Sequence, residues 1–270
     1  GSLGEHETAT IIELMKAWPW QKSVQAAQTI EFLLKRLVDE DHVNPIQIVD
    51  RRKCYKLALE GWARSQHGFE RAREIHNYMI AIWKKLNDTC LAPDTDTYNA
   101  LMLAAPTPSV AEDVLAEMQQ IHEIYNISQP NWLTYCRLLD KYSRNMENVN
   151  NATLAVARCQ ELFDCAQASS NKTKYAYTAL QLVYARSGLP TAIAQTQRIL
   201  NELTSKYKNG EILIKPTAIH YNAVLTALSR SPSRVHAETA MRILRYMEEE
   251  SSQVEPDRYS YSVTILACTR

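Results

Sequence analysis

Residues 93–101 read PDTDTYNAL, and this phrase decides the fold because it returns along the chain. Its copies are PNWLTYCRL at 130–138, PTAIHYNAV at 216–224 and PDRYSYSV at 256–263. Two weaker copies lack the proline, KYAYTAL at 174–180 and KCYKLA at 53–58. The tyrosines that anchor the copies lie 37 to 44 residues apart, at positions 55, 98, 135, 177, 221 and 261. A phrase that recurs at a nearly constant period indicates structural repeats.

Each full copy has the composition of a helix start. Proline cannot continue a preceding helix, and a small polar residue follows it that can accept hydrogen bonds from free backbone N–H groups. These residues are Asp94, Asn131, Thr217 and Asp257. A stretch of helical period comes next, then a break, and then a second amphipathic helix, as in the apolar stripe within residues 240–247.

Helix, turn, helix and linker, repeated about every 41 residues, predict an all-α fold. We expect a right-handed α-solenoid of antiparallel helical hairpins, because no single hairpin can bury both of its faces. Residues 1–4 are interpreted as a tag scar and N-terminal tail, and residues 5–44 as a degenerate first hairpin or cap. Residues 45–270 then hold about five hairpins plus the first helix of a sixth.

The composition argues against several classes of function. The formal net charge is zero, and no apolar run approaches the ~20 residues that a membrane span needs. The histidines and cysteines show no metal-ligand spacing, and the six glycines form no phosphate-binding loop. We therefore expect no enzyme activity, no cofactor or metal, no small-molecule substrate and no membrane partner.

The sequence YNAL at the start of a helix, a second helix with an A-x-x-x-L/M pattern and a linker that ends in PD resemble the pentatricopeptide repeat family. The resemblance covers about residues 45–270, is best at Tyr98 and Tyr221, and involves repeats longer than usual for that family. It implies a superhelix that binds single-stranded RNA, one base per repeat. It also implies a mitochondrial or chloroplast protein that acts in RNA processing, stability or translation.

In that family two side chains read each base: the residue after the anchor tyrosine, and the last linker residue before the next repeat. The matching pairs are Lys56 with Asp94, Asn99 with Asn131, Cys136 with Thr173, Thr178 with Thr217, and Asn222 with Asp257, and Ser262 follows the last tyrosine. Asn222 with Asp257 resembles the uracil-reading pair of the family, and Asn99 with Asn131 resembles a pyrimidine-reading pair. Helix capping remains the alternative role for the linker residues.

The second residue of each repeat wedges between bases in the family. Apolar or aromatic residues stand at four of these places, namely Leu133, Tyr175, Ile219 and Tyr259. They are expected to stack on bases, and packing between neighbouring repeats is the alternative.

Arginine recurs nine residues after the anchor tyrosine, and this column is visible without any resemblance. Its members are Arg64, Arg144, Arg186, Arg230 and Arg270, with Thr107 as the exception. An arginine ladder suits a phosphate backbone, although arginine near a helix C-terminus also interacts well with free carbonyls. RNA is therefore the expected partner. The competing hypothesis is a protein-interaction scaffold of the same fold, which the neutral charge and the three irregular base-reading pairs favour.

Overall fold

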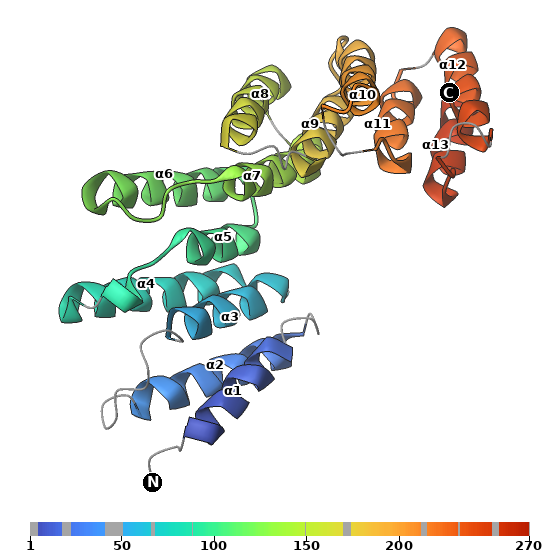
Figure 1. Cartoon of the computed structure of the whole chain (residues 1–270). Coiled ribbons are helices and arrows are strands. Elements are labelled where there is room, and N and C mark those ends of the chain that lie inside the picture. The colour runs from blue at the N-terminus through green and yellow to red at the C-terminus, as the bar shows by residue number, and fades with distance from the viewer. Residues whose placement is uncertain are drawn as a thin grey trace. The chain divides into compact units, whose positions relative to one another are not determined.

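The structure of the chain is a computed structural model that describes ten ranges, 5–17, 23–40, 51–65, 68–87, 89–148, 150–169, 174–211, 215–231, 233–249 and 254–269. Every regular element within these ranges is a helix, so the prediction of an all-α fold is confirmed. The chain divides into two compact units, residues 1–137 and 138–270, and the boundary falls inside helix α7 (Figure 1).

The described residues of the first unit contain three pairs of helices. Their bounds are α1 Glu5–Ala17, α2 Val24–Glu40, α3 Arg51–Arg64, α4 Phe69–Leu86, α5 Thr95–Ala104 and α6 Pro108–Tyr125, with the short 3-10 helix η2 at Thr89–Leu91. Helix α3 packs on α2 and α4 and also on α5, the first helix of the next pair. Figure 1 shows the α3–α4 pair between α1–α2 and α5–α6.

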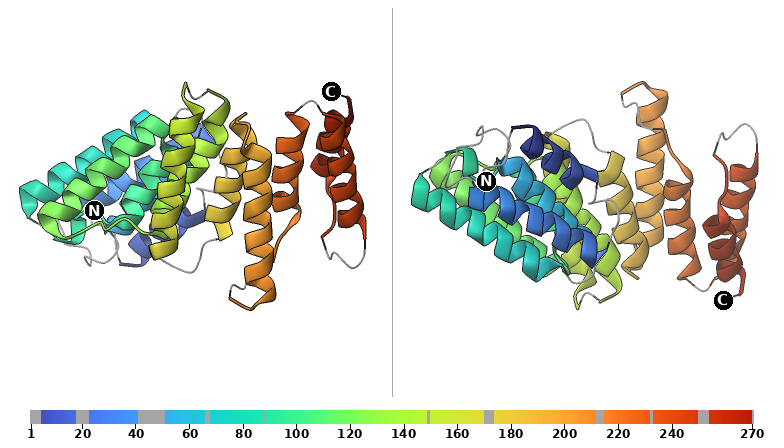
Figure 2. Two further views of the ribbon diagram at one scale, coloured as in Figure 1. Left: turned by 90° about the horizontal axis from the view of Figure 1, so that it is seen from above. Right: turned by 90° about the horizontal axis from the view of Figure 1, so that it is seen from below.

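The second unit continues the same order of elements. Helix α7 spans Trp132–Asn145, and the elements after it are η3 Met146–Asn148, α8 Ala152–Ser169, α9 Lys174–Arg186, α10 Ala192–Lys208, α11 Ala218–Ser229, α12 Arg234–Glu248 and α13 Arg258–Thr269. Helix α9 packs on α8, α10 and α11, and α11 packs on α10, α12 and α13. Figure 2 shows these helices following one another from yellow to red.

The core of each unit lies between successive pairs of helices. Every residue of α11 from His220 to Ser229 is buried, because α10, α12 and α13 all cover this helix. Its apolar side chains Val224, Leu225 and Leu228 pack with residues of the neighbouring helices. Helix α11 is largely apolar because neighbouring helices cover it on several sides, whereas α12 keeps an exposed polar face.

Local sequence signals set the ends of several helices. Helix α6 begins after Thr107, whose hydroxyl accepts from the N–H of Val110 at 3.3 Å, and Pro108 fills the first helical position. It ends at Asn126, whose φ of 55° is the left-handed conformation that asparagine tolerates. None of the described helices combines the length and the apolar composition that a membrane crossing requires.

Candidate nucleic-acid interface

Four first helices begin with the same reciprocal cap. At α5 the N–H of Thr97 donates to the Asp94 carboxylate at 2.9 Å, and the Asp94 N–H donates back to Thr97 Oγ1 at 2.9 Å. The N–H of the cap residue likewise reaches Thr134 Oγ1, His220 Nδ1 and Ser260 Oγ, each at 3.1 Å. The residue before the anchor tyrosine therefore completes each cap, and all four of these side chains are buried.

The sequence reasoning missed this column of residues. Its signal was present, since four of the six residues before the anchor tyrosines carry a hydroxyl or an imidazole, namely Thr97, Thr134, His220 and Ser260. Such side chains can accept a hydrogen bond at the third position of a helix. The column matters here because it lies beside the predicted base-reading residues.

Asn222 and Asp257 lie together as the sequence pairing requires. The Asn222 Nδ2 donates to both carboxylate oxygens of Asp257, at 3.1 and 3.2 Å. Ser260 Oγ lies 2.7 Å from Asn222 Oδ1 and 3.0 Å from Asp257 Oδ1. The backbone N–H of Ser260 is the main influence that lowers the pKa of Asp257, so this carboxylate is ionised near neutral pH.

Asn99 and Asn131 also lie together, but their contact is looser. The Asn99 Nδ2 lies 3.5 Å from Asn131 Oδ1, and the same oxygen caps α7 by accepting from the N–H groups of Leu133 and Thr134. The buried Oδ1 of Asn99 has no hydrogen-bond partner among the described residues. Capping and pairing therefore coexist in one side chain at Asn131.

Thr178 and Thr217 are joined through His220. The Nδ1 atom accepts from the Thr217 N–H at 3.1 Å, so in the neutral ring Nε2 carries the proton. That Nε2 donates to Thr178 Oγ1 at 3.2 Å. Ser262 stands apart from these contacts, is exposed, and donates to the carbonyl of Arg258 at 2.8 Å.

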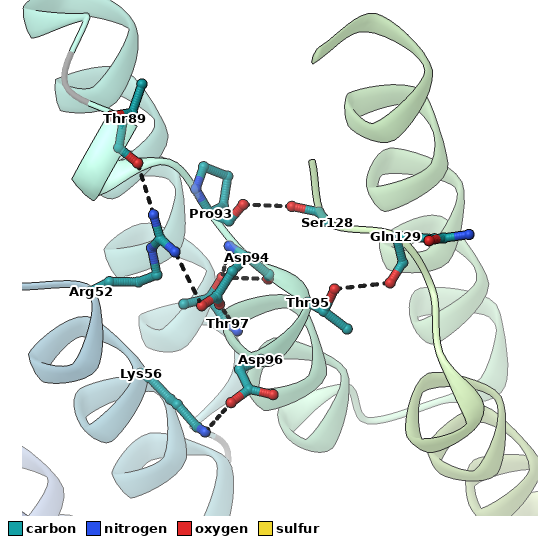
Figure 3. A network of polar contacts seen from close by, with 10 residues as sticks. All are labelled: Arg52, Lys56, Thr89, Pro93, Asp94, Thr95, Asp96, Thr97, Ser128 and Gln129. Atoms are coloured by element: carbon teal, nitrogen blue, oxygen red, sulfur yellow. Dashed lines mark hydrogen bonds and ion pairs between the residues drawn. The ribbon is translucent and has the colours of Figure 1, made fainter. Parts of the chain in front are cut away.

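Lys56 and Asp94 contact different partners in the structure. Lys56 contacts the Asp96 carboxylate instead, and Asp94 lies 3.6 Å from Arg52 Nη1 (Figure 3). Arg52 also donates to the carbonyl of Thr89 at 2.7 Å. The register of α3 against α5 brings Lys56 next to Asp96, two residues after Asp94.

The pair of Cys136 and Thr173 has only one described member. Thr173 lies outside the described residues. Cys136 is buried, and burial raises the pKa of its thiol to about 11. This side chain is therefore a neutral, weak hydrogen-bonding group.

Three of the four stacking candidates lie in the second unit and are exposed. Tyr175, Ile219 and Tyr259 are 65%, 52% and 50% exposed, which argues against a role in packing between helices. Leu133, in the first unit, is half-buried. The hydroxyl of Tyr259 lies 3.2 Å from Thr226 Oγ1, so the Tyr259 side chain reaches α11.

Three arginines of the column surround one open hollow of about 690 Å³ in the second unit. They come from three consecutive first helices, Arg144 from α7, Arg186 from α9 and Arg230 from the end of α11. Tyr259 and Leu266 of α13 form an apolar part of the same wall. Arg186 Nη1 also donates to the carbonyl of Ser143 at 2.7 Å, which holds its guanidinium in place.

Two arginines of the column are paired with a carboxylate one turn earlier. Arg64 lies 3.8 Å from Glu60 and Arg144 lies 2.8 Å from Asp140. This difference is visible in the sequence. Leu182 and Thr226 lie four residues before Arg186 and Arg230, so neither arginine has a carboxylate one turn earlier on its helix. Arg270 lies outside the described residues. The hollow of the second unit therefore holds three arginines of the column, one of which is paired with Asp140.

No family model matches the chain, and no curated protein matches it in sequence. Function is therefore inferred from the geometry of these side chains and from the repeated phrase. Within the described residues no group of three or more His, Cys, Asp or Glu side chains could hold a metal ion. The feature with the most distinctive chemistry is the hollow lined by Arg144, Arg186 and Arg230.

Proposed function

We propose that the chain is a right-handed α-solenoid of the pentatricopeptide type and binds single-stranded RNA along its first helices. The observation that carries the proposal is the hollow to which consecutive hairpins contribute Arg144, Arg186 and Arg230. Guanidinium groups at a repeating interval suit a chain of phosphates, because both fork geometry and charge match. The organellar role in RNA processing, stability or translation belongs to the same proposal.

The residues beside the hollow support RNA more than a small anion. Tyr259 has a half-exposed ring in the same wall, and base stacking on aromatic rings is sequence-tolerant. Asn222 and Asp257 stand at the start of the helices whose later turns form the hollow, and they offer donors and acceptors to a base edge. A free phosphate would use the arginines alone.

The test is the salt dependence of RNA binding. The full chain is titrated against a labelled single-stranded RNA of randomised sequence at several salt concentrations, with fluorescence anisotropy as the measurement. The variant Arg186→Ala/Arg230→Ala is expected to flatten the logarithmic salt slope by roughly 1.4, since each lost phosphate contact contributes about 0.7.

A matched control is Arg242→Ala/Arg245→Ala, which removes the same charge from α12 and leaves the hollow intact. It should change the slope far less than the first variant. Equal slopes for the two variants would contradict a site at the hollow, and absence of binding at low salt would end the RNA proposal.

Replacing the ring of Tyr259 tests the stacking role separately. Tyr259→Ala should raise the dissociation constant for RNA roughly 5- to 150-fold, because stacking contributes about 1–3 kcal/mol per base. Tyr259→Phe keeps the ring and should bind nearly as well as the parent chain. Tyr207→Ala, at an exposed tyrosine of α10, is the control. An equal loss in the Phe variant would mean that the Thr226 contact matters and stacking does not.

A protein-interaction scaffold is the second candidate, and the first unit favours it. Three basic side chains of α3 lie beside carboxylates there, Arg52 beside Asp94, Lys56 beside Asp96, and Arg64 beside Glu60. Such pairing leaves this part of the surface less suited to a polyanion. If the salt test finds no RNA binding, the scaffold becomes the preferred function.

A further inference from the structure

Three residues at the start of α13 and on α11 form a closed ring of hydrogen bonds that includes one backbone N–H group. The Asp257 N–H donates to Ser260 Oγ at 3.1 Å, and Ser260 Oγ lies 2.7 Å from Asn222 Oδ1. The Asn222 Nδ2 donates to Asp257 Oδ1 at 3.1 Å, which closes the ring. Asn222 is 5% exposed and Ser260 is fully buried, so both are held by the protein interior.

The chemistry of the ring fixes which way the Asn222 amide points. A carboxylate only accepts hydrogen bonds, so the amide nitrogen must face Asp257. Ser260 Oγ already accepts from the Asp257 N–H, and its own proton is directed to the nearer acceptor, Asn222 Oδ1. One Nδ2 hydrogen and one lone pair of Oδ1 remain for a ligand.

The first unit provides an internal comparison in which the amide is not held in this way. Thr134 occupies the place of Ser260, and its hydroxyl donates at 3.3 Å to the Oδ1 of Asn131, which is the counterpart of Asp257. The Asn99 Oδ1 has no partner among the described residues, and its Nδ2 contact is 3.5 Å long. The orientation of Asn99 therefore rests on one long contact, whereas that of Asn222 rests on a donor and an acceptor.

We propose that Ser260 is a positioning residue that sharpens the base preference at Asn222, because its hydrogen bond to the amide oxygen adds a second restraint to the orientation that Asp257 imposes. This inference rests on the proposed RNA binding. A locked amide presents its donor and acceptor in fixed order, so only one order of groups on a base edge matches it. An amide that can flip presents either order and discriminates less.

The experiment compares base preference in the full chain and in Ser260 variants. A preferred RNA is first selected from a randomised single-stranded pool with the parent chain, and four RNAs that differ only at the position sensitive to Asn222→Ala are then titrated. Ser260→Ala should reduce the ratio of best to worst affinity about 5-fold, as expected for loss of one hydrogen bond. Ser260→Thr keeps the cap contact that Thr97 and Thr134 make in other repeats. Because Asn99 Oδ1 beside Thr134 has no partner among the described residues, the threonine variant should lower the ratio as the alanine variant does.

Two further variants separate positioning from stability. Thr264→Val removes a buried hydroxyl that bonds only to the Ser260 carbonyl, at 2.8 Å, and should leave the ratio unchanged. Ser260→Cys keeps the side-chain volume but donates weakly, and it replaces the alanine variant if that variant does not fold. NMR relaxation of the Asn222 side-chain amide, measured without RNA, should show greater mobility in Ser260→Ala than in the parent chain.

The outcomes distinguish this inference from the proposed function. If the parent chain binds no RNA, both are overturned. If it binds RNA but Ser260→Ala keeps the same ratio, the role of Ser260 is overturned and RNA binding stands. A loss that is equal for all four RNAs, or a similar loss in Thr264→Val, would also overturn the positioning role.

Discussion

Replacing Arg71 with methionine is expected to lower the free energy of unfolding of the α2–α4 region by about 3 kcal/mol. The reason is Glu31, whose side chain is only 8% exposed and contacts Arg71 Nε at 2.9 Å and Nη2 as well. Trp62 Nε1 donates to the same carboxylate at 3.1 Å. Lys35 Nζ lies 2.9 Å from Glu31 Oε1 and remains in the variant. The expected loss is therefore at the lower end of the roughly 3–5 kcal/mol found when one partner of a buried ion pair is removed.

The loss should depend on pH in a definite direction. The hydrogen bond from Arg71 lowers the pKa of Glu31 from 4.5 to about 2. A carboxyl group with a lowered pKa stabilises the fold fully above pH 4.5, and this contribution disappears as the pH falls from 4.5 to about 2. Arg71→Met should therefore differ most from the parent chain near neutral pH and least below pH 2.

Tryptophan fluorescence is a suitable measurement, because all five tryptophans lie within residues 1–137, at positions 18, 20, 62, 83 and 132. Chemical denaturation followed by this signal reports on the first unit. Lys16→Met is the control in the same unit, since Lys16 forms an exposed ion pair with Glu13 and should contribute at most about 1 kcal/mol. A similar loss in both variants would show that the burial of Glu31 is not the cause.

The helix starts were the part of the fold that the sequence could predict. Proline followed by Asp94 or Asp257 marks a boundary by local chemistry alone, and the structure places both residues at the N-cap of a helix. The partner of Asp94 could not be predicted in the same way. Whether Lys56 meets Asp94 or Asp96 depends on the register of α3 against α5, which is a property of packing between helices.

The arginine column shows how much of the site a sequence pattern can reveal. The spacing of Arg186 and Arg230 was visible, and the absence of a carboxylate one turn before each was visible too. That these two side chains share a hollow with Tyr259 could not be read from the spacing, because it depends on the direction of each side chain. The ring around Asn222 likewise required the position of a buried serine.

The anchor tyrosines do not contribute equally to stability, and a pair of substitutions should show this. Tyr177 is 1% exposed, and its ring meets Phe163 edge-on with centroids 4.9 Å apart. Its hydroxyl donates to Glu202 at 3.0 Å and accepts from Lys206 at 2.9 Å. Tyr261 is 42% exposed, and its hydroxyl donates to the exposed Glu248 at 3.1 Å.

Tyr177→Ala is expected to destabilise the α8–α10 region by about 3–5 kcal/mol, because it leaves a cavity in place of a buried ring. Tyr261→Ala should cost roughly 1 kcal/mol or less at its half-exposed position. Tyr177→Phe should fall between them, since it keeps the ring and loses only the hydroxyl contacts. Hydrogen exchange of backbone amides in residues 174–208 and 258–269, followed by mass spectrometry, measures both effects locally. Equal losses at Tyr177 and Tyr261 would mean that the phrase itself, and not the burial of its tyrosine, determines the stability of a repeat.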